Sequence, residues 1–185
     1  MNSYVFEFKG FDPSKEEYYG TLLTLSNGLI GVRGEIELYP SKYGVFVSGI
    51  YDYTPIFYRE LVNLPRILGL NINVNGRQIR LVNCRKLDLV RRLNVLEGVL
   101  STSLECLVND APVVYESVRI VHRRRRNIVL QHSKLKTTVD NVVVESLIEL
   151  DKCNPLVPST MCIKHYKVKE LVVSDEQVSC LLYTS

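Results

Sequence analysis

Alternation of apolar and polar side chains, repeated in short segments, restricts the fold more than any other feature of the sequence. Leu70, Ile72 and Val74 alternate with asparagines, and residues 142–150 alternate in the same way. A period of two places successive side chains on opposite faces of a β-strand. Composition also favours β-strands over helices, because Ala111 is the only alanine and valine is abundant. Further strands are predicted at 4–9, 77–82, 115–122, 128–133 and 161–168.

Turn residues separate these strands. Asn75-Gly76 lies between two alternating runs, and both residues tolerate the positive φ that a type I′ hairpin turn requires. A second turn is predicted at Asn109-Asp110-Ala111-Pro112. Residues 123–127 are predicted to link two strands, and the prolines of Asn154–Pro158 to break the pattern before the strand at 161–168.

Two short helices are predicted in this otherwise β chain. In Asp12–Glu17, Pro13 suits a first helical position, and Ser14 with Glu17 has the spacing of a capping box. The second helix is predicted over Phe57–Leu64, from apolar residues on one face. With no repeat, linker or internal boundary, residues 1–185 are predicted to form a single all-β domain, one large antiparallel β-sandwich with one or two short helices.

Charge, length and cysteine usage exclude several classes of protein. A net charge of +3 is too small to predict a nucleic-acid partner. No apolar run approaches the roughly 20 residues of a membrane helix, and residues 1–10 do not read as a signal peptide. The five cysteines are odd in number and lack C-x-x-C spacing, which indicates reduced thiols. We therefore expect a cytoplasmic protein without membrane or nucleic-acid partners.

Two motifs suggest phosphate binding, but each has a simpler interpretation. Gly28-x-x-Gly31-x-x-Gly34 is neither a dinucleotide fingerprint nor a P-loop, so tight turns and close backbone contact are the favoured interpretation. The arginines Arg123–Arg126 could grip phosphate or nucleic acid. A solvated hairpin tip is favoured, because no aromatic residues interleave with them.

No catalytic constellation emerges from the remaining residues. His122, His132 and His165 lack zinc-site spacing, and no G-x-S-x-G is present. Glycosidic cleavage needs a carboxylic acid and usually a second carboxylate, but the sequence cannot pair carboxylates in space. The candidates are predicted to be solvated or capping: Glu35, Glu37, Asp52, Glu60, Asp88 and Glu97. We predict no catalytic residue, no metal and no cofactor.

Three segments together carry a family resemblance. Residues 25–35 read LSNGLIGVRGE, residues 44–52 read GVFVSGIYD and are followed by ELVNLP at 60–65, and residues 85–89 read RKLDL. In this order they resemble the N-terminal region of glycoside hydrolase family 65, which includes maltose, trehalose and kojibiose phosphorylases. The resemblance is strongest over residues 20–90.

The resemblance implies an N-terminal β-sandwich whose catalytic (α/α)6 barrel lies elsewhere in the parent protein. The family's catalytic glutamic acid and phosphate site belong to that barrel, so neither transfers to a position here. The chain is therefore expected to be a non-catalytic domain, truncated at its C-terminal end and inactive alone. Its expected partners are the barrel and a second copy of itself, with the disaccharide contacted only indirectly.

By resemblance, six positions lie nearest the barrel contact or the active-site mouth: Asn27, Arg33, Glu35, Asp52, Glu60 and Asn63. Bonding within the sandwich is the competing interpretation of these positions. The second hypothesis for the chain is a free-standing carbohydrate-binding or oligomerisation module, using tyrosines to stack on sugars: Tyr39, Tyr43, Tyr51, Tyr53 and Tyr58. A basic nucleic-acid binder working through Arg123–Arg126 is the third.

Overall fold

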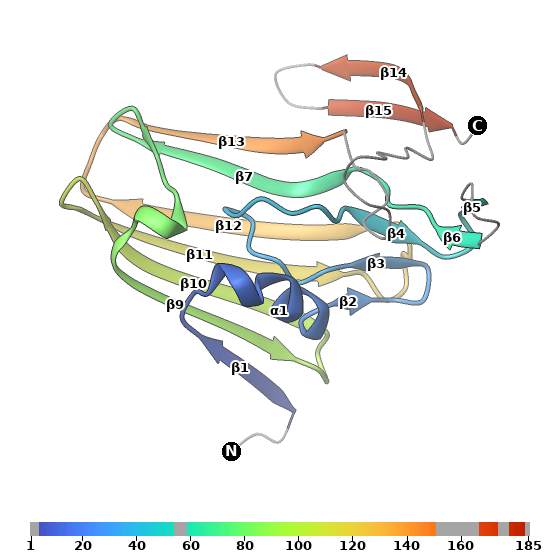
Figure 1. Ribbon diagram of the computed structural model, residues 1–185, viewed down its shortest axis with the longest axis horizontal. Helices are drawn as coiled ribbons and strands as arrows, with labels where there is room; N and C mark the ends of the chain where they lie inside the picture. The colour runs from blue at the N-terminus through green and yellow to red at the C-terminus, as the bar shows by residue number, and fades with distance from the viewer. Residues whose placement is uncertain (1–3, 54–58, 151–166, 174–177, 184–185) are drawn as a thin grey trace.

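A five-stranded antiparallel sheet forms one layer of the molecule (Figure 1). The computed structural model describes residues 4–53, 59–150, 167–173 and 178–183. The spatial order of this sheet is β1-β9-β10-β11-β12. Its strands are β1 (Val5–Lys9), β9 (Arg85–Asn94), β10 (Val99–Val108), β11 (Ala111–Val121) and β12 (Val129–Thr137).

A second sheet, β13-β7-β8, forms the facing layer. It contains β7 (Arg66–Val74), β8 (Arg77–Gln78) and β13 (Val142–Glu149). Ile72 and Val74 of β7 share one buried core with Leu89, Leu104 and Tyr115 of the larger sheet. The alternating apolar residues of β7 therefore face the buried core, as the sequence predicted. The prediction of an all-β antiparallel sandwich is confirmed.

Smaller elements lie around the two layers. Helix α1 (Glu16–Leu22) follows the 3-10 turn η1 (Pro13–Lys15), and η2 (Leu81–Asn83) follows β8. The remaining strands form three small antiparallel sheets: β2 (Leu25–Ser26), β3 (Ile30–Val32) and β4 (Val45–Val47); β5 (Tyr51–Tyr53) and β6 (Arg59–Leu61); β14 (Lys167–Val173) and β15 (Val178–Tyr183). No helix within the described ranges is long and apolar enough to cross a membrane.

The predicted turns are confirmed, with one adjustment. Asn75 and Gly76 both have positive φ, at 50° and 73°, between the paired strands β7 and β8. Asn109 and Asp110 also have positive φ, between the paired strands β10 and β11. Ala111 already belongs to β11, so this turn is two residues shorter than the sequence suggested. The predicted turn at Asn154–Pro158 lies outside the described residues.

Two helix predictions need correction. Asp12, not Ser14, caps the N-terminal helical segment, because the Asp12 carboxylate accepts a hydrogen bond from the Ser14 backbone N–H at 3.0 Å. The helix predicted over Phe57–Leu64 is wrong over its described part, since Arg59–Leu61 is strand β6. Pairing of β6 with β5 outweighs the helical spacing of a few apolar residues, a spacing that is ambiguous in short segments.

Candidate functional site

An irregular segment, residues 33–38, passes between the two layers and is held by buried charge pairs. Arg91 of β9 forms a bidentate ion pair with Glu16 of α1, with N–O distances of 2.7 and 3.0 Å. Both side chains are almost fully buried, at 1% and 3% exposure. Glu16 also accepts a hydrogen bond from the backbone N–H of Ile36 at 3.2 Å. Burial raises the pKa of the Glu16 carboxyl above its usual value, and the Arg91 guanidinium opposes this change.

A second arginine of the large sheet, Arg119 of β11, binds the same segment. Its guanidinium donates to the Arg33 carbonyl at 2.8 Å and lies 3.0 Å from the Glu37 carboxylate. The Ser117 hydroxyl donates to the same Glu37 oxygen at 2.8 Å. Glu37 is therefore a buried, paired carboxylate rather than the solvated or capping one that the sequence suggested.

Arg66 of β7 reaches the segment from the opposite layer. It donates to the carbonyls of Ile36 and Glu37 at 3.0 and 3.3 Å, and to the Glu149 carboxylate at 3.0 Å. Arg66, Arg91 and Arg119, which we call the arginine cluster, thus bind one segment from both sheets. Planar guanidinium groups suit this role, because each presents several donors in a fixed fork. The cluster ties the two layers of the sandwich together.

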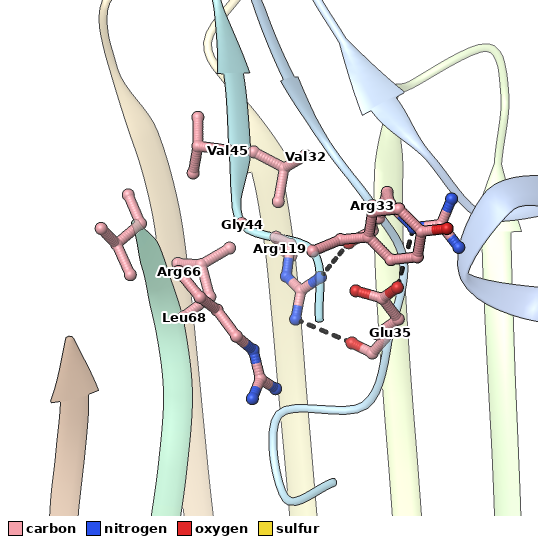
Figure 2. A pocket seen from close by; sticks show the side chains of 10 residues that line it. Val32, Arg33, Glu35, Gly44, Val45, Arg66, Leu68 and Arg119 are labelled. Atoms are coloured by element: carbon pink, nitrogen blue, oxygen red, sulfur yellow. Dashed lines mark hydrogen bonds and ion pairs between the residues drawn. The ribbon is translucent and has the colours of Figure 1, made fainter. Parts of the chain in front are cut away.

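Arg33 and Glu35 lie beside this cluster and pair with each other (Figure 2). The Arg33 Nε–Glu35 Oε1 distance is 2.7 Å, and the Arg33 guanidinium lies 3.8 Å from the Tyr43 ring centroid. Glu35 is buried, which again corrects the expectation of a solvated carboxylate. The pocket that these residues line has a volume of about 10 Å³, room for a single water molecule. A sugar ring does not fit there.

The six positions selected by resemblance fall into three places. Arg33 and Glu35 form the pair just described, and Asn63 lies nearby, accepting from the Gly44 N–H at 2.8 Å and donating to the Lys42 carbonyl at 2.9 Å. Asp52 and Glu60 are opposite each other on the β5–β6 hairpin. Asn27 lies in the turn between β2 and β3.

Asn27 joins two turns that are distant in the sequence. Its side-chain amide donates to the carbonyls of His122 and Arg126, both at 2.9 Å. Its oxygen accepts from two N–H groups of its own turn. His122 Nδ1 in turn accepts from the backbone N–H groups of Arg124 and Arg125. The arginine run is thus an exposed hairpin tip with a fixed backbone.

Replacing Asn27 by alanine is expected to lower the free energy of unfolding by about 2 kcal/mol, because several partly buried backbone groups lose their partner. Urea unfolding of the purified chain measures the change. Asn127→Ala is the matched control, since Asn127 is exposed in the same hairpin tip and its side chain makes no hydrogen bond within the described residues. Equal destabilisation by both substitutions would contradict this role for Asn27.

The tyrosines proposed for sugar stacking have different environments. Tyr39 packs edge-on against Phe11 with 5.1 Å between ring centroids, and Tyr43 is covered by Arg33. Tyr51 is exposed on β5. The Tyr53 side chain and the whole of Tyr58 lie outside what the structure describes. These rings therefore do not line up as one stacking platform in the described part of the chain.

Sequence reasoning missed the arginine cluster and its partner Glu16. A signal was present, because Arg91 alternates with Leu89 and Leu93 on the core-facing side of β9. A charged residue at an inward position predicts a buried pair. Within the described ranges, no group of three histidine, cysteine, aspartate or glutamate side chains could hold a metal ion.

The fold and the site define a class of protein: a β-sandwich domain braced by internal arginine–carboxylate pairs. The model of the glycosyl hydrolase family 65 N-terminal domain matches residues 6–182 of the chain, which belongs to that family.

Its relatives include disaccharide phosphorylases. Over 155 residues it is 32% identical to the kojibiose phosphorylase of Caldanaerobacter subterraneus subsp. tengcongensis, covering 81% of this chain and 20% of that protein. It is 30% identical to the kojibiose phosphorylase of Thermoanaerobacter brockii, covering 82% of this chain and 20% of that protein. It is 25% identical to the maltose phosphorylase of Bacillus subtilis, covering 71% of this chain and 19% of that protein. The chain thus spans about one fifth of the length of these relatives.

A solved structure supports the fold independently. A solved structure named "Putative kojibiose phosphorylase from human microbiome" superposes with a TM-score of 0.80 over 98% of this chain and 25% of that one. Their sequences are 16% identical, so this likeness supports the fold alone.

Proposed function

We propose that this chain is a non-catalytic domain of a disaccharide phosphorylase, and that it supports a separate catalytic barrel. The observation that carries the proposal is the internal pairing of the buried carboxylates. Glu16, Glu35 and Glu37 each face an arginine at 2.7–3.0 Å. Acid–base cleavage of a glycosidic bond needs carboxyl groups with space between them for the bond and its attacking group. Each of these carboxylates is already paired with an arginine, and the pocket that Glu35 lines has a volume of only about 10 Å³.

The β5–β6 hairpin is the surface that we assign to the barrel contact. It pairs only with itself in the described part of the chain, and an isolated two-stranded hairpin is marginally stable in water. Tyr51 and Leu61 lie opposite each other on it, with 55% and 37% of their surface exposed. Asp52 and Glu60 form the neighbouring cross-strand pair. An exposed apolar pair suits an interdomain contact, and we include dimer formation among the roles of the domain.

A release assay tests the non-catalytic role. The purified chain is incubated with kojibiose, maltose and trehalose, with and without inorganic phosphate. We expect no release of glucose or glucose phosphate above a protein-free control. Phosphate-dependent release that Glu16→Gln or Glu37→Gln abolishes would place an active site in this chain and overturn the proposal.

A further inference from the structure

A second pocket lies between β7, β8 and residues 37–40, and its size distinguishes it from the pocket at Arg33 and Glu35. Its volume is about 470 Å³, against about 10 Å³ for the other. Small-molecule sites have volumes of roughly 300–1,000 Å³. We call this the β7–β8 pocket. It shares only Arg66 with the smaller pocket.

Apolar side chains form much of its wall. Leu38, Leu70, Ile79 and Leu147 line it together with Tyr39. The contact of Tyr39 with Phe11 fixes the position of the tyrosine ring. All of these residues except Leu147 also pack in or against the sandwich core, so most of the wall rests on the core of the fold. The wall offers a preformed surface to the C–H groups of a ligand.

A polar rim accompanies this wall. Gln78 Nε2 donates to Asn71 Oδ1 at 2.6 Å, and Arg80 Nε donates to Gln78 Oε1 at 3.5 Å. The two N–H groups of the Asn71 amide and the terminal N–H groups of Arg80 have no partner among the described residues. The rim therefore presents oriented hydrogen-bond donors beside an apolar wall.

The formal charges that line the pocket balance. Arg66 and Arg80 are matched by Glu37 and Glu149. An anion would meet two carboxylates, and a purely apolar ligand would leave the polar rim without partners. A neutral ligand with hydroxyl groups on its edge and C–H groups on its face meets both requirements.

We propose that the β7–β8 pocket binds a pyranose ring of a neutral mono- or disaccharide. Asn71, Gln78 and Arg80 bind its hydroxyl groups, and Tyr39 with Leu38 and Leu70 contact its C–H face. This site goes beyond the supporting role proposed above, because it breaks no bond and needs no barrel.

Titration of the isotope-labelled chain with glucose and kojibiose, followed by NMR, tests the proposal. The side-chain amide signals of Asn71 and Gln78 are expected to shift on binding, with a Kd of about 1 mM. Absence of any shift at saturating millimolar sugar, or shifts confined to other residues, would overturn it. This titration and the release assay test different proposals. Sugar binding without product release supports both the non-catalytic role and the β7–β8 site. Product release without sugar binding in this pocket contradicts both.

Variants locate the site. Gln78→Leu is expected to weaken binding about fivefold to tenfold through the loss of neutral hydrogen bonds. Asn83→Leu, an exposed amide that does not line the pocket, is the matched control and keeps wild-type affinity. Val82 is 60% exposed and lines the pocket, so Val82→Trp can block it without disturbing the core. Binding unchanged in both pocket variants would exclude this site.

Discussion

Replacing Arg91 by alanine is expected to lower the free energy of unfolding by about 3–5 kcal/mol, because it leaves a carboxylate buried without its partner. Glu16 is 3% exposed and binds Arg91 through both oxygens. Only the Ile36 N–H would still donate to it among the described residues. A loss of this size is a large part of the roughly 5–15 kcal/mol that stabilises a typical domain. Urea unfolding monitored by circular dichroism measures it.

Two further variants separate the buried pair from general surface effects. Arg92→Ala is the matched control, because Arg92 is the next residue of β9 and forms an exposed pair with Glu7. It is expected to change stability little, as surface ion pairs usually do. The double variant Glu16→Leu/Arg91→Met removes both charges and should recover most of the loss. If Arg91→Ala and Arg92→Ala behave alike, the cluster does not tie the layers together.

The loss in free energy of unfolding caused by Arg91→Ala, called the deficit below, should depend on pH in a defined direction. Burial raises the pKa of Glu16 in the folded chain above its usual value of 4.5. The folded state therefore holds this proton more tightly than the unfolded state, and stability falls as pH rises through 4.5 and above. Without Arg91 the pKa of Glu16 rises further, so the deficit should shrink as the solution is made acidic. A deficit that grows on acidification would contradict this account.

The sandwich could be predicted because its signals are local. Alternation in β7 and the Asn75-Gly76 turn each depend on a few neighbouring residues. Local signals failed at Arg59–Leu61, where pairing with β5 decides the structure. A short apolar segment fits a helix or a strand equally well until its partner is known.

The charge pairs could not be predicted because their partners are distant in the sequence. Glu16 and Arg91 are 75 positions apart, and the chain passes through α1 and strands β2 to β8 between them. The family resemblance did lead to Arg33 and Glu35, which are two positions apart and form a direct pair. It also led to Asn63, whose role is to hold Gly44. The matched segments thus mark positions of dense internal bonding.

Gly44→Ala should destabilise the chain by about 3 kcal/mol, because an added methyl group meets backbone rather than a movable side chain. A Cβ at this position would lie 1.8 Å from the Leu64 carbonyl oxygen and 2.8 Å from the Pro65 carbonyl carbon. The Leu64 backbone cannot yield easily, since it pairs with Val45 through hydrogen bonds of 3.0 and 3.4 Å. The strain would also displace Tyr43, which covers Arg33.

Gly31→Ala is the matched control for this substitution. Its Cβ would meet no atom closer than the Phe46 carbonyl oxygen at 4.0 Å, and its φ is not in the left-handed region. Alanine there should be neutral or slightly stabilising, because it restricts the unfolded chain. Both glycines lie in segments that carry the family resemblance, yet only Gly44 is required by close backbone packing. Equal unfolding midpoints in urea for the two variants would show that the Leu64 carbonyl can move away, and that this contact does not fix the segment.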